Sequence, residues 1–176
     1  MSDNKTLILG GVRSGKSRLA ERLATESQLP IVYIATATGD DDEMRDRIAL
    51  HRAHRPQHWK VIEEPLHLAS ALKPHANDSC CILIDCLTLW LTNLLLHPDP
   101  MCFTAERTSF LEILPRISSK LILVSNETNM GITPLGELSR RYCDEAGRLH
   151  QEIAAQCDQV ILTVAGLPLV LKGSTV

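Results

Sequence analysis

The sequence predicts an α/β fold in which a mostly parallel β-sheet is covered by helices on both faces. Two features of the chain carry this prediction. Short, continuously apolar runs alternate with longer segments of helical pattern, as they do where strands are buried on both faces. The first apolar run, residues 6–9, leads into a glycine-rich turn and then into a helical pattern. With 176 residues and neither an internal repeat nor a linker, the chain is predicted to form a single domain, residues 1–176.

The strands are predicted from the apolar runs. The run at residues 80–84 is wholly apolar and ends at Asp85, which is typical of a strand buried on both faces. Cys80 and Cys81 are adjacent in this run, so their side chains are expected on opposite faces of the sheet. The predicted strands cover residues 6–9, 31–34, 60–63, 80–84, 120–125, 159–164 and 167–172.

The helices are predicted from periodic segments between these runs. Leu19 and Leu23 fall on one face of the first helix. Pro56 is expected to end the second helix, and residues 97–100 (His-Pro-Asp-Pro) are expected to end the fourth. Pro115 is expected to bend or end the fifth. The predicted helices cover residues 16–27, 42–54, 66–72, 87–96, 104–118 and 135–157.

Polar residues follow several of these strands. In parallel sheets, ligands bind beyond the carboxyl ends of the strands. The loops after Leu9, Ile34, Ile84 and Ser125 should therefore meet at one edge of the sheet. The sequence thus predicts a single site at that edge.

The glycine-rich turn fits the phosphate-binding pattern G-x-x-x-x-G-K-[ST]. Its glycines let successive backbone N–H groups point inward at phosphate oxygens, and the following helix aims its positive end at the same place. Lys16 is expected to reach the β- and γ-phosphates, and the Ser17 hydroxyl is expected to bind Mg²⁺. The predicted nucleotide-binding residues of this phosphate loop are Gly10, Gly11, Val12, Arg13, Ser14, Gly15, Lys16 and Ser17.

Asp85 is the second predicted metal ligand. An acidic residue at the end of an apolar strand completes the Mg²⁺ site of phosphate-loop proteins, directly or through water. An aspartate at a strand end is otherwise usually a turn or cap residue. The phosphate loop in the same chain favours the metal role.

A basic segment at residues 47–58 contains three histidines and three arginines. One interpretation is a solvated helix face. The other is a phosphate-handling segment, because a neutral imidazole can attack phosphorus to form a phosphoramidate and arginines can stabilise the transferring group. The chemistry of these residues does not choose among His51, His54 and His58.

Composition excludes several other functions. The net charge is −3 and aromatic residues make up 3% of the chain, which gives no electrostatic footprint for nucleic acid. None of the six cysteines forms a C-x-x-C pair, so we expect reduced thiols and a cytoplasmic protein. The polar start of the chain predicts no signal peptide. The most apolar run, residues 87–96, is about half the length that a membrane span needs.

Taken together, the motifs resemble one family, the bifunctional adenosylcobinamide kinase / adenosylcobinamide-phosphate guanylyltransferases of cobalamin biosynthesis. The resemblance spans nearly the whole chain, and its most specific part joins residues 42–59 to the later segments. The matching segments are 10–17, Tyr33-Ile34-Ala35-Thr36, Asp42-Glu43-Met44, Arg47-Ile48 with His51, Arg55, Pro56 and Trp59, 83–90, Thr92-Asn93-Leu94, Val124-Ser125-Asn126-Glu127, Gly131-Ile132, Pro134, 146–151 and 165–169.

The resemblance implies two reactions. ATP or GTP would phosphorylate the aminopropanol hydroxyl of adenosylcobinamide, and GMP from GTP would then be transferred to adenosylcobinamide phosphate through a covalent histidine intermediate. The matching histidine is His51. The resemblance also implies a recombinase-like P-loop NTPase fold with three layers, and a homotrimer. Beyond the phosphate loop, the nucleotide contacts that it implies are Ala35, Thr36, Ala37, Arg52, Ala53, His54, Arg55, Glu63 and Asp85.

The chain departs from the family pattern in one loop. The family usually has Asn-Glu-Val-Gly followed by Gly-Ile-Val-Pro, and this chain has Thr128, Asn129 and Thr133 at three of these positions. An asparagine tolerates the left-handed backbone conformation better than most residues do, so the loop is expected to keep its shape, while the fit of the corrinoid and the efficiency of the kinase step are the properties that the departure would affect.

Overall fold

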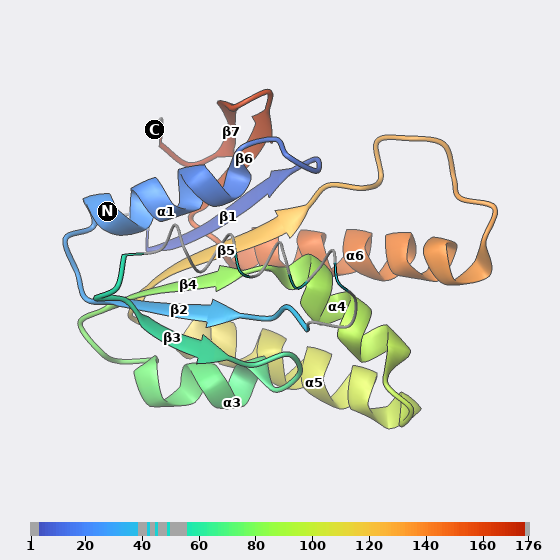
Figure 1. The fold of residues 1–176 in the computed structure, drawn as a ribbon, viewed down its shortest axis with the longest axis horizontal. Helices are drawn as coiled ribbons and strands as arrows, with labels where there is room; N and C mark the ends of the chain where they lie inside the picture. Colours follow the sequence, from blue (N-terminus) through green and yellow to red (C-terminus); the bar gives the residue numbers. More distant parts are fainter. Residues whose placement is uncertain (1–3, 39–41, 43–44, 46–48, 50–55, 175–176) are drawn as a thin grey trace.

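The computed structural model describes residues 4–38, 42, 45, 49 and 56–174. In this part of the chain, seven strands form one sheet in the order β3-β2-β4-β5-β1-β6-β7 (Figure 1). The first six strands in this order pair in parallel, and β7 pairs antiparallel to β6. The strands are β1 (Lys5–Gly10), β2 (Ile31–Ala35), β3 (Lys60–Glu63), β4 (Cys81–Asp85), β5 (Lys120–Asn126), β6 (Gln159–Val164) and β7 (Leu167–Lys172). The mostly parallel sheet predicted from the apolar runs is confirmed.

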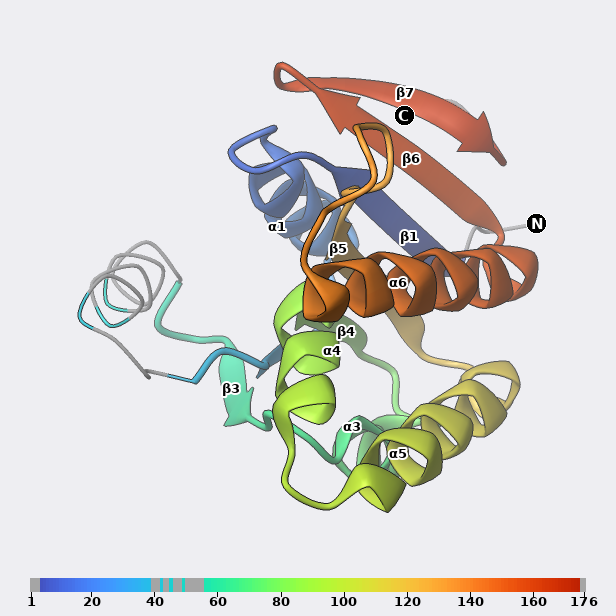
Figure 2. The same ribbon diagram turned by 90° about the vertical axis from the view of Figure 1, so that its right-hand side faces the viewer.

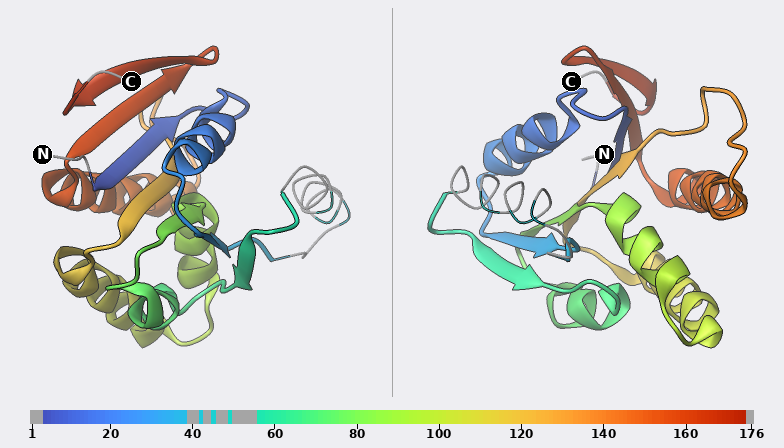
Figure 3. Two further views of the ribbon diagram at one scale, coloured as in Figure 1. Left: turned by 90° about the vertical axis from the view of Figure 1, so that its left-hand side faces the viewer. Right: turned by 45° about the vertical axis from the view of Figure 1, so that its right-hand side comes forward.

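Helices cover both faces of the sheet, as Figures 2 and 3 show. One apolar core lies under α1 (Lys16–Glu26), and the other lies under α3 (Leu68–Leu72), α4 (Leu87–Leu96), α5 (Pro100–Ile113) and α6 (Glu137–Gln156). Successive strand residues alternate between the two cores: Leu7 and Leu9 pack in one and Ile8 in the other. Cys80 and Cys81 divide in the same way, as predicted.

The predicted and observed bounds differ most at α5, which was expected over residues 104–118 and covers Pro100–Ile113. The helix begins at Pro100, because the Asp99 side chain accepts a hydrogen bond from the Met101 N–H and caps it. Proline is well suited to a first helical position, since its missing N–H needs no partner there. The turn at residues 97–100 therefore ends one helix and starts the next. Pro115 ends α5, as expected, at a 3₁₀ turn over Leu114–Arg116.

The remaining boundaries shift by a few residues. The third predicted helix begins at Leu68 instead of 66 and continues into a 3₁₀ turn over Lys73–His75. The longest helix begins at Glu137 instead of 135. The predicted helix at 42–54 is helical at residues 42, 45 and 49, and its other residues before 56 lie outside the described part.

Two further observations bear on the sequence predictions. All six cysteines are free. No helix in the described part of the chain has the length and apolar character that crossing a bilayer requires.

Candidate active site

The carboxyl ends of the parallel strands bring the predicted residues to one edge of the sheet. Ala35 at the end of β2 stands level with Glu63 on one side and Asp85 on the other. Leu9 stands level with Ser125, and Gly10 with Asn126. The predicted meeting of the four loops at this edge is confirmed.

The phosphate loop curls between the end of β1 and the start of α1. Gly15 has a φ of 95°, and Arg13 has a φ of 56°. The Ser14 N–H donates to the Gly11 carbonyl at 3.2 Å, and Leu19 N–H donates to the Gly15 carbonyl at 3.0 Å as the helix starts. Alternating backbone conformations of this kind turn successive N–H groups toward a common point, which is the arrangement that binds phosphate. The loop therefore has the backbone geometry that its sequence pattern predicts.

Lys16 folds back across this loop. Its Nζ donates to the Gly11 carbonyl at 3.0 Å, and the side chain is largely buried. Burial lowers the pKa of Lys16, while the nearby Cys86 and Asp85 act in the opposite direction. The ammonium is held near Asp85 in a site partly removed from water, where interactions with phosphate oxygens are stronger than in bulk water.

The hairpin of β6 and β7 supports the loop from behind, a role that the sequence analysis did not predict. The Gly166 N–H donates to the Ser14 carbonyl at 2.8 Å. Ala165 and Gly166 both have positive φ, 52° and 81°, as a two-residue hairpin turn requires. A Cβ atom on Gly15 would lie 3.2 Å from the Gly166 Cα atom, so the two turns pack against each other backbone to backbone.

Gly10 is expected to tolerate no side chain. A Cβ atom there would lie 2.6 Å from the Thr163 carbonyl oxygen and would also contact Ser14 Oγ. We expect Gly10→Ala to lower the free energy of unfolding by about 1–3 kcal/mol, because the strand backbone must move. Urea unfolding measures this change. Gly11→Ala is the matched control, since no atom lies within 4 Å of a Cβ there. Equal stability of the two variants would contradict the packing described for Gly10.

Thr36 holds the start of α4 in place beside Asp85. Its buried hydroxyl donates to the Cys86 carbonyl at 2.6 Å and accepts from the Cys86 N–H at 2.9 Å. Its own carbonyl accepts from the Asn93 amide at 2.9 Å. The Thr36 side chain is thus engaged inside the protein, and the half-buried Ala35 and Ala37 flank it.

Thr36→Val is expected to lower the free energy of unfolding by about 1–3 kcal/mol. The valine would fill the same space but leave both polar groups of Cys86 without their partner. Thr36→Ser keeps the hydroxyl and should stay closer to the parent protein. Chemical denaturation of the three proteins side by side tests this, and a valine variant as stable as the serine variant would contradict it.

The residues present fit a Mg²⁺ site that is completed by the substrate. Ser17 lies half-buried in the first turn of α1, and Asp85 lies at the end of β4, close enough to Lys16 to influence its pKa. Hydroxyl and carboxylate oxygens are ligands that Mg²⁺ accepts. Within the described ranges there is no cluster of three or more histidine, cysteine, aspartate or glutamate side chains. Mg²⁺ usually takes its other ligands from phosphates and water, so a two-residue site suits a nucleotide complex.

A polar network lies behind the edge, between β5, α4 and α6. The His150 Nε2 lies 2.8 Å from Ser125 Oγ, which lies 3.4 Å from Thr88 Oγ1. Thr88 in turn accepts from the Asn126 N–H at 2.7 Å. Burial lowers the pKa of His150, although Glu127 acts in the opposite direction, so the neutral imidazole is favoured. Ser125 and His150 were predicted only as parts of family segments, because their pairing depends on how α6 packs against β5.

The other predicted contacts divide into two groups. Glu63 is exposed at the end of β3, beside Ala35. His51, Arg52, Ala53, His54 and Arg55 lie outside the described residues.

Known proteins match this sequence along almost the whole chain. The matching family model, described as cobinamide kinase / cobinamide phosphate guanyltransferase, covers residues 6–171. The bifunctional adenosylcobalamin biosynthesis protein CobP of Pseudomonas aeruginosa is 62% identical, over 96% of this chain and 98% of its own. The corresponding protein CobU of Escherichia coli is 38% identical, over 94% of this chain and 98% of its own.

Solved structures show the fold. The RadB recombinase superposes with a TM-score of 0.52 and 16% identity over 91% of this chain and 74% of its own. A protein of Pyrococcus horikoshii OT3 superposes with a TM-score of 0.53 and 11% identity over 98% of this chain and 88% of its own. The predicted recombinase-like architecture is therefore confirmed. With the family model and the two relatives, it follows that the chain belongs to the cobinamide kinase / cobinamide phosphate guanyltransferase family.

Proposed function

We propose that one nucleotide site serves two successive reactions of this protein. As a member of its family, the protein is an enzyme of cobalamin biosynthesis with kinase and guanylyltransferase activities. In the first reaction, ATP or GTP phosphorylates the aminopropanol hydroxyl of adenosylcobinamide. In the second, GMP is transferred from GTP to that phosphate, giving adenosylcobinamide-GDP and pyrophosphate. The phosphate loop, with Lys16 folded across it, is the observation that carries the proposal.

A kinase without guanylylation is the weaker alternative. The P. aeruginosa and E. coli relatives are both described as bifunctional, and each is matched over nearly its whole length. Nothing in the described site favours a single activity.

In both reactions, the loop amides and Lys16 would hold the triphosphate at the start of α1. The loop donors and the ammonium would stabilise the negative charge that moves onto the transferring and leaving phosphate oxygens. Ser17 and Asp85 would hold Mg²⁺, which supplies further neutralisation of the phosphate charge when it is bound.

Guanylyl transfer through a covalent intermediate requires a nucleophile that can attack the α-phosphorus, and Lys16 and Ser17 of the loop would already hold the phosphates and Mg²⁺. We assign this role to His51, whose imidazole would attack the α-phosphorus in line while pyrophosphate leaves. The phosphate of adenosylcobinamide phosphate would then displace the histidine from the same phosphorus. The neighbouring Arg52 and Arg55 would stabilise the charge on the transferring group.

The proposed assembly is a homotrimer in the cytoplasm. Leu167, Leu169 and Leu171 of the edge strand β7 are each more than half exposed, and exposed apolar edges of this kind mark interaction surfaces. The free cysteines suit a compartment where thiols stay reduced. Light scattering of the purified protein should give three times the mass of the chain, and the mass of a monomer would contradict the assembly.

A product assay separates the two-reaction proposal from a kinase alone. The protein is incubated with adenosylcobinamide, GTP and Mg²⁺, and the corrinoid products are separated and weighed by mass spectrometry. We expect adenosylcobinamide phosphate first and adenosylcobinamide-GDP later. If adenosylcobinamide phosphate forms but never acquires GMP, the protein is a kinase without guanylyltransferase activity. The absence of both products would contradict the proposal.

A further inference from the structure

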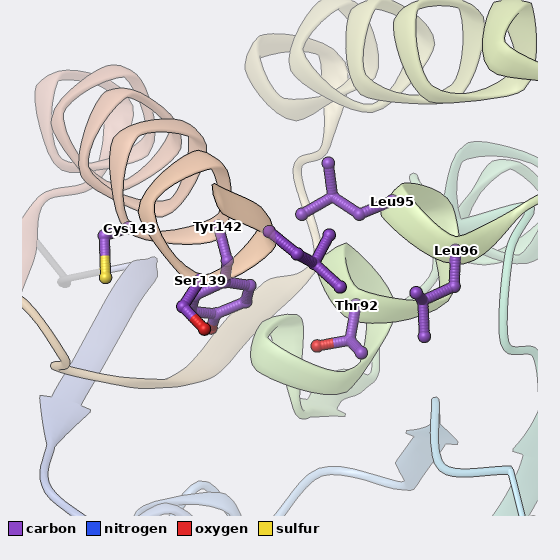
Figure 4. Close-up of a pocket in the computed structure, with 7 residues that line it drawn as sticks. Thr92, Leu95, Leu96, Ser139, Tyr142 and Cys143 are labelled. Carbon is purple, nitrogen blue, oxygen red and sulfur yellow. The ribbon is translucent and has the colours of Figure 1, made fainter. Parts of the chain in front are cut away.

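An open, mostly apolar groove lies between α4 and α6. Its volume is about 230 Å³, and Figure 4 shows side chains of the two helices facing each other across it. It is lined chiefly by Thr92, Leu95 and Leu96 of α4 and by Leu138, Tyr142 and Cys143 of α6. Leu96 and Leu138 at its rim are 63% and 51% exposed, so a second molecule could cover a substantial apolar area here.

The groove is placed beside the nucleotide site by the order of the chain. α4 begins two residues after Asp85, and α6 follows the loop that leaves β5. The Tyr142 hydroxyl reaches inward to the neighbourhood of Thr88, the residue that binds the Asn126 N–H at the sheet edge. Burial raises the pKa of Tyr142 to about 12, so the hydroxyl stays protonated. The inner end of the groove therefore lies against the ends of β4 and β5.

Three hydrogen bonds connect the phosphate loop to the groove through residues 127–129. The Glu127 N–H donates to the Gly10 carbonyl at 3.0 Å. The Glu127 carboxylate accepts from the Asn129 N–H at 2.7 Å, and the Asn129 amide donates to the carbonyl of Cys143 in the groove wall at 3.0 Å. Asn129, one of the departures from the family pattern, thus fixes the Glu127 side chain and joins the loop to α6.

We propose that the α4–α6 groove binds one apolar edge of the corrinoid substrate, and that Glu127 accepts the proton of the hydroxyl group that is phosphorylated. This inference rests on the proposed function. In an in-line transfer, the acceptor oxygen attacks the γ-phosphorus from the side opposite the leaving phosphate. The acceptor oxygen–hydrogen bond breaks as its oxygen–phosphorus bond forms. The nucleoside diphosphate takes the electrons of the bond that breaks, and the proton passes to the Glu127 carboxylate and then to water.

The groove fits an edge of the corrinoid and not the whole ring. Its volume is below the roughly 300–1,000 Å³ of sites that enclose a drug-sized ligand. A corrin ring is broad and flat and carries methyl groups and amide arms on its rim. Methyl groups on one edge would pack against Leu95, Leu96 and Leu138. An arm that leads inward would bring its terminal hydroxyl toward Glu127 and the phosphate loop.

The groove is tested by changing its rim without changing its backbone. We compare the full-length double variant Leu96→Ser/Leu138→Ser with its apolar control Leu96→Met/Leu138→Met. In the kinase reaction, the serine variant should raise the KM for adenosylcobinamide roughly tenfold and leave the KM for the nucleotide unchanged. The methionine variant should keep both values near those of the parent protein. Native mass measurements on all three proteins check whether the groove contacts another copy of the chain.

Glu127 is tested by a change that keeps its hydrogen bond to Asn129. Glu127→Gln retains an oxygen that can accept from the Asn129 N–H but cannot take a proton at neutral pH. We expect kcat for phosphorylation to fall by roughly 10²–10⁴-fold while the KM for adenosylcobinamide stays within about twofold. Glu127→Asp should recover part of the rate. A role limited to loop structure would give the opposite order: the glutamine variant, which keeps the hydrogen bond to Asn129, would stay near the parent protein, and the shorter aspartate would be the more damaging change.

The outcomes distinguish this inference from the function on which it rests. If the parent protein does not phosphorylate adenosylcobinamide, the proposed function fails and the inference fails with it. If the parent protein is active but the serine variant keeps its KM for adenosylcobinamide, the groove is not the corrinoid site and the proposed function stands. A serine variant whose mass changes while its KM does not would identify the groove as a contact between copies. A full phosphorylation rate for Glu127→Gln would remove Glu127 as the proton acceptor.

Discussion

Lys16→Ala is expected to slow both phosphoryl transfer and guanylyl transfer by about 10³-fold. The Lys16 ammonium lies across the phosphate loop and near Asp85, in a partly dehydrated site, and it is the cation best placed to meet the phosphate oxygens in the described part of the chain. Removing one preorganised donor of this kind costs about 10²–10³ in rate, and a charged donor falls at the upper end. Initial rates of both products, measured with saturating nucleotide, give the two values.

Lys73→Ala is the matched control, because Lys73 is exposed in a 3₁₀ turn after α3. Its rates should equal those of the parent protein. A Lys16→Ala variant that loses one activity and keeps the other would contradict a nucleotide site shared by both reactions.

His51→Ala is expected to abolish guanylyl transfer, lowering its rate by about 10⁴-fold or more, while adenosylcobinamide phosphate accumulates. The loss is large because no other group would form the covalent bond to GMP. Separation of the corrinoid products after incubation with adenosylcobinamide and GTP reads out both species. The same amount of adenosylcobinamide-GDP from the variant and the parent protein would contradict the assignment.

His54→Ala and His58→Ala are the controls for this assignment. The chemistry of the residues leaves three histidines as candidate nucleophiles, and only the family resemblance selects His51. We expect both control variants to form adenosylcobinamide-GDP, His58→Ala at the rate of the parent protein and His54→Ala more slowly, because the resemblance implies that His54 contacts the nucleotide. If one of them fails while His51→Ala succeeds, the nucleophile is the histidine that was removed in that variant.

The phosphate loop was predictable because its information is local. Eight consecutive residues specify the backbone turn, and the strand before it and the helix after it provide the necessary context. The order of strands and helices was also predictable from the sequence, because a strand buried on both faces needs a continuous apolar run. The ends of the strands then located the site at one edge of the sheet.

The start of α5 was predicted wrongly although its signal is local. Asp99 and Pro100 were interpreted as the end of α4, and the same two residues are a capping residue and a first-turn proline. A proline that follows an aspartate should therefore be considered as a helix start as well as a helix end.

The supports of the site depend on contacts between distant parts of the chain. The hydrogen bond from the Gly166 N–H to the Ser14 carbonyl joins residues near opposite ends of the sequence, and neither residue type indicates that it forms. The link from Glu127 through Asn129 to Cys143 depends on where α6 packs. A sequence pattern contains no information on such contacts until the packing of the elements is known.

Thr36 lies at the predicted edge of the sheet, but its side chain has a structural role there. The resemblance implies that Thr36 contacts the nucleotide, and the structure places it at the site edge with its hydroxyl bound to Cys86. Its side chain positions the start of α4 beside Asp85. Any nucleotide contact at Thr36 would therefore come from its backbone.

The most direct test of the account is the covalent intermediate. The protein is incubated with Mg²⁺ and GTP labelled at the α-phosphate, without a corrinoid, and then denatured, digested and mapped. We predict a label that is labile in acid and stable in base, as a phosphoramidate is, on the peptide that contains His51, and no label from GTP marked at the γ-phosphate. An unlabelled protein, or a label that remains in His51→Ala, would contradict the central claim that GMP passes through His51.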